Sequence, residues 1–262
     1  MTDDMNKYAL MMDAYTEIKP ELDAARQTKP MPAQPPLGQV LADFGPMPEE
    51  ALFLGVASDK LPVLLNLHDS IPGPLLVIGG AGSGKTALLQ IIARAAGRMH
   101  QPEKLQFGAL TNHPDEWSGF EGTPSNVGTF PAYHRSSEDF ILSLASWAHG
   151  NKSSRQFILL LLDDLESITS MDVETVDNLR WLLLRGPSRR VWPIITLNAD
   201  RAHNMQPWLD AFRTRIYGNI QNGDVISKLN IEGAQPESLA SGSEFALSEG
   251  KRWLRFSIPG LD

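Results

Sequence analysis

Hydrophobic and polar positions change their spacing along the chain and predict a helical arm followed by an α/β body. In residues 5–27 the apolar side chains recur every three or four positions, which is the period of an amphipathic helix. Pro20 either breaks this helix or opens a second short one, because proline fits only the first turn of a helix. Residues 29–38, KPMPAQPPLG, predict an extended linker. We therefore expect an arm and linker over residues 1–38, packed on its own domain or on a neighbouring subunit, and a main domain over 39–262.

From residue 51 onward, short apolar runs alternate with helical patterns. Strands are predicted in ALFLGVA, LPVLLNL, GPLLVIGG, KLQFGAL, FILLLL, VWPIITLN and TRIYGNI, and helices over 86–99, 138–149 and 173–184. Residues 113–137 are expected to form a long loop, and residues 243–258 a hairpin that turns at Glu249–Gly250. Pro193 indicates either a strand start or an edge strand. The alternation predicts an α/β fold with a mainly parallel central sheet flanked by helices.

A glycine-rich stretch joins the third strand to the helix over 86–99 and matches the phosphate-loop pattern G-x-x-x-x-G-K-[ST]. Glycines let successive backbone N–H groups turn inward around an anion, and the helix start adds its positive dipole end. Lys85 is expected to reach the β- and γ-phosphates, and the Thr86 hydroxyl to bind Mg²⁺. The predicted ligands are therefore ATP and Mg²⁺, and the nucleotide-binding residues are Gly79, Gly80, Ala81, Gly82, Ser83, Gly84, Lys85, Thr86 and Ala87.

Two later strands end in polar residues that suit metal binding and hydrolysis. Asp163, directly after FILLLL, is the expected Mg²⁺ carboxylate, with a helix cap as the structural alternative. Asp164 stands where many nucleotide hydrolases place the glutamate that orients water, and its side chain is one methylene shorter. Asn198, with Thr196 second, is the candidate contact to the γ-phosphate, and a strand-end turn is the alternative. Lys85, Asp164 and Asn198 are thus the catalytic candidates, and the short Asp164 predicts slow hydrolysis.

Three stretches in the same order resemble the RecA-like motor domains of the FtsK/SpoIIIE/HerA group, which includes the ATPase domains of type VII secretion. They are residues 51–86, the pair 157–168 and 179–200, and residues 214–247, so the resemblance covers roughly residues 50–260. It implies a RecA-like P-loop fold with a C-terminal β-hairpin, assembled as a ring such as a hexamer, with nucleotide between subunits. Arg185 and Arg215 match positions from which a neighbouring subunit donates a cation; surface ion pairs are the alternative.

The chain departs from that family's usual pattern at four places. It has Asp164 where the family has glutamate, and Asn198 where glutamine is usual. The strand after the first helix ends in Thr111–His113 instead of an aspartate, and Pro187 follows Arg185-Gly186 where another arginine is common. The pattern therefore supports nucleotide binding more fully than it supports hydrolysis.

Composition limits the function further. The net charge of −8 argues against a generally basic nucleic-acid binder. The segment 180–215, however, holds seven arginines and two aspartates, which gives it a net charge of +5. Such a segment suits contact with phosphates, with an acidic surface of a neighbouring subunit, or with solvent. The chain has no cysteine, which fits a cytoplasmic protein, and no apolar run long enough to span a membrane.

Three functions remain open from the sequence. The favoured one is an ATP-hydrolysing ring that translocates or remodels a polymer, either DNA or polypeptide. The second is a nucleotide-binding assembly or regulatory module with slow or no hydrolysis. The third is a small-molecule kinase, against which stands the lack of an arginine-bearing lid after the helix over 86–99.

Overall fold

The computed structural model describes residues 34–151, 154–249 and 252–262. The helix expected over residues 5–27 lies outside these ranges, so the division into an arm and a domain stays a prediction. Pro36–Asp262 forms one compact unit, whose first helix, α2 (Leu37–Phe44), begins within the last two residues of the expected linker. The two ends of this unit meet, since the Leu37 N–H donates to the Gly260 carbonyl at 2.9 Å.

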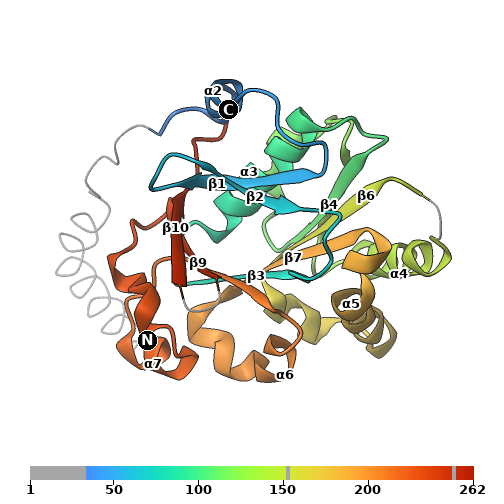
Figure 1. The fold of residues 1–262 in the computed structure, drawn as a ribbon. Helices are drawn as coiled ribbons and strands as arrows, with labels where there is room; N and C mark the ends of the chain where they lie inside the picture. The colour runs from blue at the N-terminus through green and yellow to red at the C-terminus, as the bar shows by residue number, and fades with distance from the viewer. Residues whose placement is uncertain (1–33, 152–153, 250–251) are drawn as a thin grey trace, which may run out of the picture. The chain divides into compact units, whose positions relative to one another are not determined.

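A single 10-stranded sheet forms the centre of the unit, in the order β2-β1-β10-β9-β8-β3-β7-β6-β4-β5 (Figure 1). The strands from β8 to β5 in this order pair in parallel, and the others pair antiparallel. This arrangement confirms the predicted mainly parallel sheet and the C-terminal hairpin. The bounds are β1 Ala51–Ala57, β2 Pro62–Asn66, β3 Leu75–Gly79, β4 Leu105–Thr111, β5 Asn126–Pro131, β6 Phe157–Asp163, β7 Val191–Asn198, β8 Thr214–Tyr217, β9 Glu244–Glu249 and β10 Arg252–Ser257.

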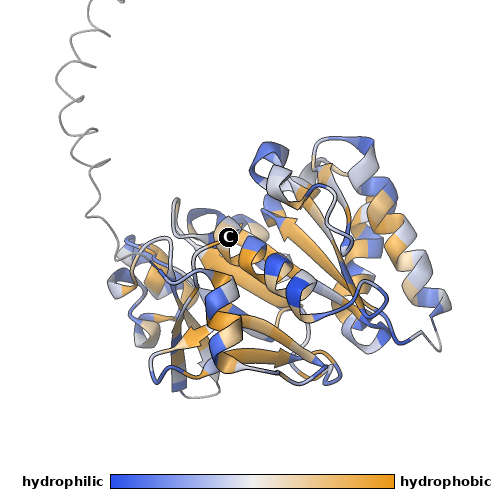
Figure 2. Cartoon of the chain, turned by 90° about the horizontal axis from the view of Figure 1, so that it is seen from above, coloured by the Kyte–Doolittle hydropathy of each residue, from blue (hydrophilic) through white to orange (hydrophobic). Residues whose placement is uncertain are grey.

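Helices cover both faces of the sheet, and most strand residues are hydrophobic (Figure 2). Their apolar side chains divide between two core clusters, one on each face. In β3, Leu75 and Val77 join the core under α2 and α3 (Lys85–Met99), whereas Leu76 and Ile78 join the core on the other face. That second core lies against the remaining helices, α4 (Arg135–Gly150), α5 (Val173–Arg185), α6 (Gln206–Leu209) and α7 (Gly223–Leu229). A strand buried on both faces needs a continuous apolar run, which explains FILLLL in β6.

Two expectations from the sequence are wrong. The expected loop over residues 113–137 contains β5, an edge strand that pairs only with β4 and is half exposed, so it lacks a long apolar run. The same stretch holds the 3₁₀ helix η1 (Pro114–Phe120). Of the two alternatives for Pro193, the edge strand is the wrong one, since β7 lies between β3 and β6. Pro193 lies near the start of β7, and the pairing of β7 with β3 begins one residue later, at Ile194, as the strand-start alternative expects.

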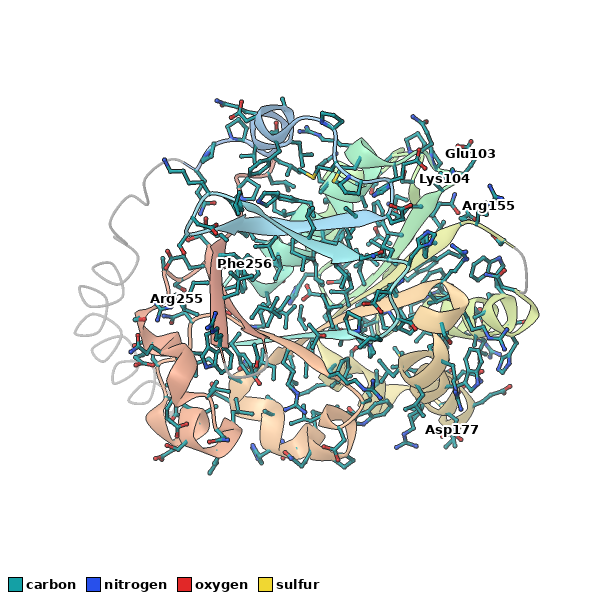
Figure 3. All side chains as sticks on the ribbon, in the orientation of Figure 1. Glu103, Lys104, Arg155, Asp177, Arg255 and Phe256 are labelled. Atoms are coloured by element: carbon teal, nitrogen blue, oxygen red, sulfur yellow. The ribbon has the colours of Figure 1, made fainter. Side chains whose placement is uncertain are left out.

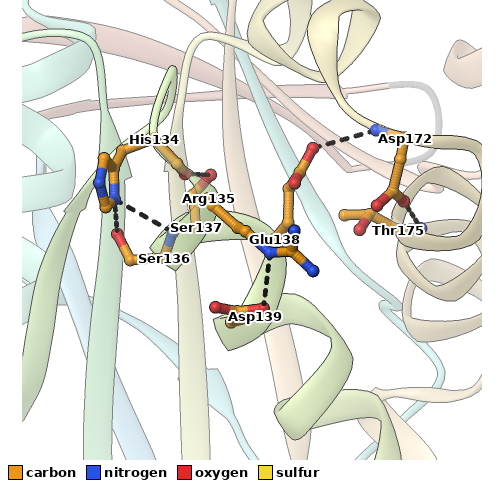
Figure 4. A network of polar contacts seen from close by, with 8 residues as sticks. All are labelled: His134, Arg135, Ser136, Ser137, Glu138, Asp139, Asp172 and Thr175. Carbon is orange, nitrogen blue, oxygen red and sulfur yellow. Dashed lines mark hydrogen bonds and ion pairs between the residues drawn. The ribbon is translucent and has the colours of Figure 1, made fainter.

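The beginnings of α4 and α5 are joined by polar contacts (Figure 4). The His134 side chain caps α4 by accepting from the Ser136 N–H at 3.2 Å, and Asp172 caps α5 by accepting from the Thr175 N–H at 2.7 Å. Glu138 of α4 accepts from the Asp172 N–H at 3.1 Å, so both helices start close together. His134 therefore has a structural role in capping.

Among the described residues, no helix is long and apolar enough to cross a bilayer.

Candidate nucleotide-binding site

The phosphate loop lies between the carboxyl end of β3 and the start of α3. Gly82 and Gly84 have positive φ angles of 68° and 90°, which glycine adopts without strain. The Lys85 ammonium donates to the carbonyls of Gly79 at 3.0 Å and Gly80 at 2.8 Å. It therefore lies over the loop, where a phosphate would offer it a charged acceptor.

The environment of Lys85 is partly dry and acidic. Burial lowers the pKa of Lys85 from its ordinary value of 10.5, and the charges of Asp163, Asp164 and Asp200 oppose that shift. Asp200 was not among the residues expected from the sequence; it lies in the 3₁₀ helix η4 (Ala199–Met205), which directly follows β7. The nearby carboxylates favour the charged form of Lys85, which is the form that binds a phosphate.

Asp163 and two threonines form the polar centre of the site. The Thr86 hydroxyl donates to Asp163 Oδ2 at 2.8 Å, and the Thr196 hydroxyl donates to Asp163 Oδ1 at 2.9 Å. Asp163 is only 8% exposed, and Thr196 is fully buried. The adjacency of β3, β7 and β6 in the sheet brings these three residues together.

This pair of residues fits a magnesium ion. Mg²⁺ prefers oxygen ligands and is held in nucleotide sites by one or two protein groups together with the phosphates. Thr86 and Asp163 present a hydroxyl and a carboxylate that already lie 2.8 Å apart, next to the phosphate loop. These two residues would therefore hold the ion, as the sequence predicts.

Asp164 and Asn198 occupy the ends of neighbouring strands but are engaged in local turns. Asp164 has φ 84° and ψ 103°, and its N–H donates to Thr196 Oγ1 at 2.7 Å. Its carboxylate accepts from the Glu166 N–H at 3.1 Å and so caps the 3₁₀ helix η2 (Leu165–Ser170). Asn198 lies opposite Gly79 in the sheet and accepts from the Asp200 N–H at 3.2 Å. Their roles in hydrolysis stay predictions.

Residues from the C-terminal part of the unit brace the phosphate loop, and the sequence did not point to them as site residues. The Gly80 N–H donates to the Asn219 carbonyl at 2.8 Å, and the Ser241 hydroxyl donates to the Gly82 carbonyl at 3.0 Å. Gly84 packs on Gly242: a Cβ at Gly84 would lie 2.6–2.8 Å from Gly242 main-chain atoms. No local pattern could have revealed these contacts, because they join segments far apart in the chain.

This bracing predicts a strong effect of Gly84→Ala. The substitution places an alanine at a positive φ, and this strain costs about 1–3 kcal/mol of stability. The new Cβ also pushes the loop away from Gly242. We expect Tm to fall by about 4–10 °C, measured by circular dichroism, and ATP affinity to fall as well. Gly122→Ala is the matched control, because Gly122 has φ 72° but nothing within 4 Å of the new Cβ. Equal losses in the two variants would contradict a bracing contact with Gly242.

Comparisons with known proteins identify the fold. No protein-family model and no curated protein matches the chain by sequence. Among solved structures, the cytoplasmic domain of the Thermomonospora curvata type VII secretion ATPase EccC matches with a TM-score of 0.64 and 13% identity, over 88% of this chain and 28% of that one. A protein described as an ATPase matches with a TM-score of 0.67 and 14% identity, over 88% and 96% of the two chains.

The pCW3 conjugation coupling protein TcpA, solved with ATPγS, matches with a TM-score of 0.63 and 13% identity, over 87% of this chain and 70% of that one. The chain has the fold of an FtsK-type ATPase domain. It spans less than half of the EccC structures that it matches. The RecA-like fold inferred from the sequence is thereby confirmed.

The two candidate trans-acting arginines lie away from the phosphate loop of their own domain. Arg185 is exposed at the end of α5, just before the amino end of β7, whereas the loop lies at the carboxyl end of the sheet. Arg215 is half-buried, and its guanidinium donates to the carbonyls of Leu209 at 2.7 Å and Phe212 at 3.3 Å. A contact between Arg185 and a nucleotide would therefore require a second subunit.

Proposed function

We propose that this chain is a Mg²⁺-dependent ATPase that works as one subunit of a ring. The observation that carries the proposal is the convergence of Lys85, Thr86 and Asp163 on the phosphate loop. The FtsK-type fold supports it, since the matched solved structures include proteins named as ATPases and one complex with ATPγS.

Each residue of the site has a separate role in the proposed reaction. The loop N–H groups and the start of α3 bind the phosphates, and Lys85 neutralises their charge. Thr86 and Asp163 hold Mg²⁺, which offsets negative charge on the transferred phosphoryl group. Thr196 holds both Asp163 and the backbone of Asp164, so it positions the metal ligand and the water-orienting carboxylate relative to each other.

The test is ATP binding and steady-state hydrolysis by the purified chain, with and without Mg²⁺, together with its mass in solution. We expect binding of Mg²⁺-ATP, slow release of phosphate and a mass above that of the monomer. A chain that does not bind ATP would refute the proposal as a whole.

The second candidate is a nucleotide-binding module in which hydrolysis is slow or absent. Asp164 favours it, because its short side chain is engaged in capping η2. The variant Asp164→Glu distinguishes the two candidate functions. We expect its kcat to exceed the parent value by about 10-fold or more, because a carboxylate that ends about 1 Å short of the attacking water slows hydrolysis. Asp139→Glu, at an exposed position on α4, is the control. Equal turnover by Asp164→Glu and the parent would show that side-chain length does not limit the rate.

The partners of the proposed ring are a polymer and further copies of the chain. EccC is described as a secretion ATPase and TcpA as a conjugation coupling protein, so both polypeptide and DNA are candidate polymers. Stimulation of ATP hydrolysis by DNA, or its absence, decides between them. We further propose that Arg185 reaches the nucleotide of a neighbouring subunit in the cytoplasm; Arg215 is the alternative, and using it would require release from its two carbonyl acceptors.

A further inference from the structure

The end of the sheet opposite the phosphate loop carries cations in front of three neighbouring strands. Lys104 precedes β4, Arg155 lies two residues before β6, and Arg190 precedes β7. The Phe157 N–H donates to the Lys104 carbonyl at 2.8 Å, and the Ile158 N–H donates to the Arg190 carbonyl at 2.9 Å. The pairing of the parallel strands thus places all three cations at the same end of the sheet.

These cations line one hollow of about 240 Å³. Lys104 and Arg155 are exposed, and Figure 3 shows them at this end of β4 and β6. The other lining residues are Glu49, Glu50, His68, His100 and Phe157. The volume is several times the roughly 30 Å³ that one water molecule occupies in the liquid, so it has room for a phosphate group.

Arg190, which also lines the hollow, is stacked on an aromatic ring. Its φ of 67° is uncommon for a residue other than glycine, and its guanidinium carbon lies 4.7 Å from the centroid of the Phe157 ring. The same ring also contacts the His68 ring, whose centroid lies 5.1 Å from it. A guanidinium stacked in this way loses little further freedom when it binds an anion.

The three cations lack carboxylate partners. Across residues 34–151, 154–249 and 252–262, none of the ion pairs within 4.0 Å involves Lys104, Arg155 or Arg190. Adjacent strands lie about 4.8 Å apart, which is shorter than the screening length of about 8 Å at physiological salt. The three cations therefore start from backbone positions that lie within the screening length of one another, and, within the described residues, neither glutamate of the hollow forms an ion pair with them within 4.0 Å.

Two glutamates also line the hollow. Glu49 and Glu50 come from the segment before β1, and the charge of Glu49 acts on His100. His100 donates to the Ala51 carbonyl at 2.9 Å, and burial lowers its pKa, so it adds little positive charge of its own. The hollow thus carries three cations, all from the strand starts, against two carboxylates.

We propose that this hollow binds a phosphate-bearing anion, separately from the nucleotide site at the other end of the sheet. Two guanidinium groups and an ammonium in a row suit several phosphate oxygens better than one carboxylate, because each phosphate offers more acceptors and more charge. The anion is either the backbone of a nucleic acid strand or a free oligophosphate.

The test uses full-length protein with Lys85→Ala as the background, so that the phosphate loop does not bind the probes. The test variant adds Lys104→Gln and Arg155→Gln, and leaves Arg190 in its stack on Phe157. The control adds Arg135→Gln and Arg252→Gln, which remove the same charge from exposed positions elsewhere. Circular dichroism checks that all variants are folded.

The probes are a fluorescein-labelled oligonucleotide, followed by anisotropy, and inorganic tripolyphosphate, followed by calorimetry. For the oligonucleotide we expect the slope of log K against log salt, between about 50 and 200 mM, to become shallower by about 1.5–2 in the test variant alone. For tripolyphosphate we expect about a 10-fold weaker Kd, since two charge-assisted contacts are lost and solvent screens exposed groups.

Each outcome decides the proposal. An oligonucleotide response identifies a nucleic acid backbone as the ligand, and a tripolyphosphate response alone identifies a free oligophosphate. Absence of binding by both probes, or equal weakening in the control, overturns the proposal. Binding of poly-glutamate with no binding of either phosphate probe would also overturn it, in favour of an acidic polypeptide.

Discussion

Lys85→Ala is expected to weaken ATP binding by roughly 100-fold. The ammonium lies over the phosphate loop on the carbonyls of Gly79 and Gly80, and alanine removes its charge-assisted bonds to phosphate. Such bonds contribute about 1.5–3 kcal/mol, which corresponds to about 10–150-fold in Kd. Titration with a fluorescent ATP analogue or calorimetry measures the loss.

The fold of the Lys85→Ala variant should be unchanged, because burial already opposes the charge of Lys85 in the free protein. The matched control is Lys228→Ala, which removes an exposed lysine from the last turn of α7. If Lys85→Ala bound ATP as tightly as the parent, the assignment of this loop to a triphosphate would be wrong.

Asp163→Asn is expected to remove the dependence of nucleotide binding on Mg²⁺ and to lower hydrolysis by about 100-fold or more. Asparagine keeps the shape of the side chain but lacks the charge that offsets a divalent cation, and loss of a buried charged partner costs about 3–5 kcal/mol. The hydroxyls of Thr86 and Thr196 can rotate to meet the new amide, so the fold should survive.

The measurement is ATPγS affinity with and without Mg²⁺, together with steady-state phosphate release. Asp139→Asn, which removes an exposed carboxylate from α4, is the control and should behave as the parent. A magnesium effect on affinity that persists in Asp163→Asn would move the metal site to other residues.

The proposed anion site and the nucleotide site lie at opposite ends of the same parallel strands. β7 begins directly after Arg190 and ends at Asn198, which lies opposite Gly79. The two proposals thus assign different ligands to the two ends of β7. The two sites can therefore be tested separately, because variants at Lys104 and Arg155 leave the phosphate loop intact.

Much of the candidate nucleotide site could be located from the sequence because it is local. The turn from β3 into α3 depends on a continuous run of glycines, lysine and threonine, and its geometry follows from backbone freedom at those positions. Asp163 could be predicted because it ends a strand buried on both faces, which is visible as an apolar run.

The sequence was less informative about Asp164, Asn198 and the arginines. Both polar side chains were expected at strand ends, but only the structure shows that each accepts a bond from a backbone N–H two residues later. Similarly, Arg185 and Arg215 look alike in the sequence, whereas the structure leaves one exposed and holds the other on two carbonyls. β5 was missed because a half-exposed edge strand leaves a weak hydrophobic pattern.

By itself, the sequence determined the α/β class, the phosphate loop and the acid that ends β6, since each depends on neighbouring residues and on the period of apolar positions. Tertiary structure alone decided that Thr196 joins Asp163 to Asp164, that Asn219, Ser241 and Gly242 brace the loop, and that Lys104, Arg155 and Arg190 share one hollow. The physical reason is the order of strands in the sheet, which brings distant segments side by side and is not encoded in any local pattern.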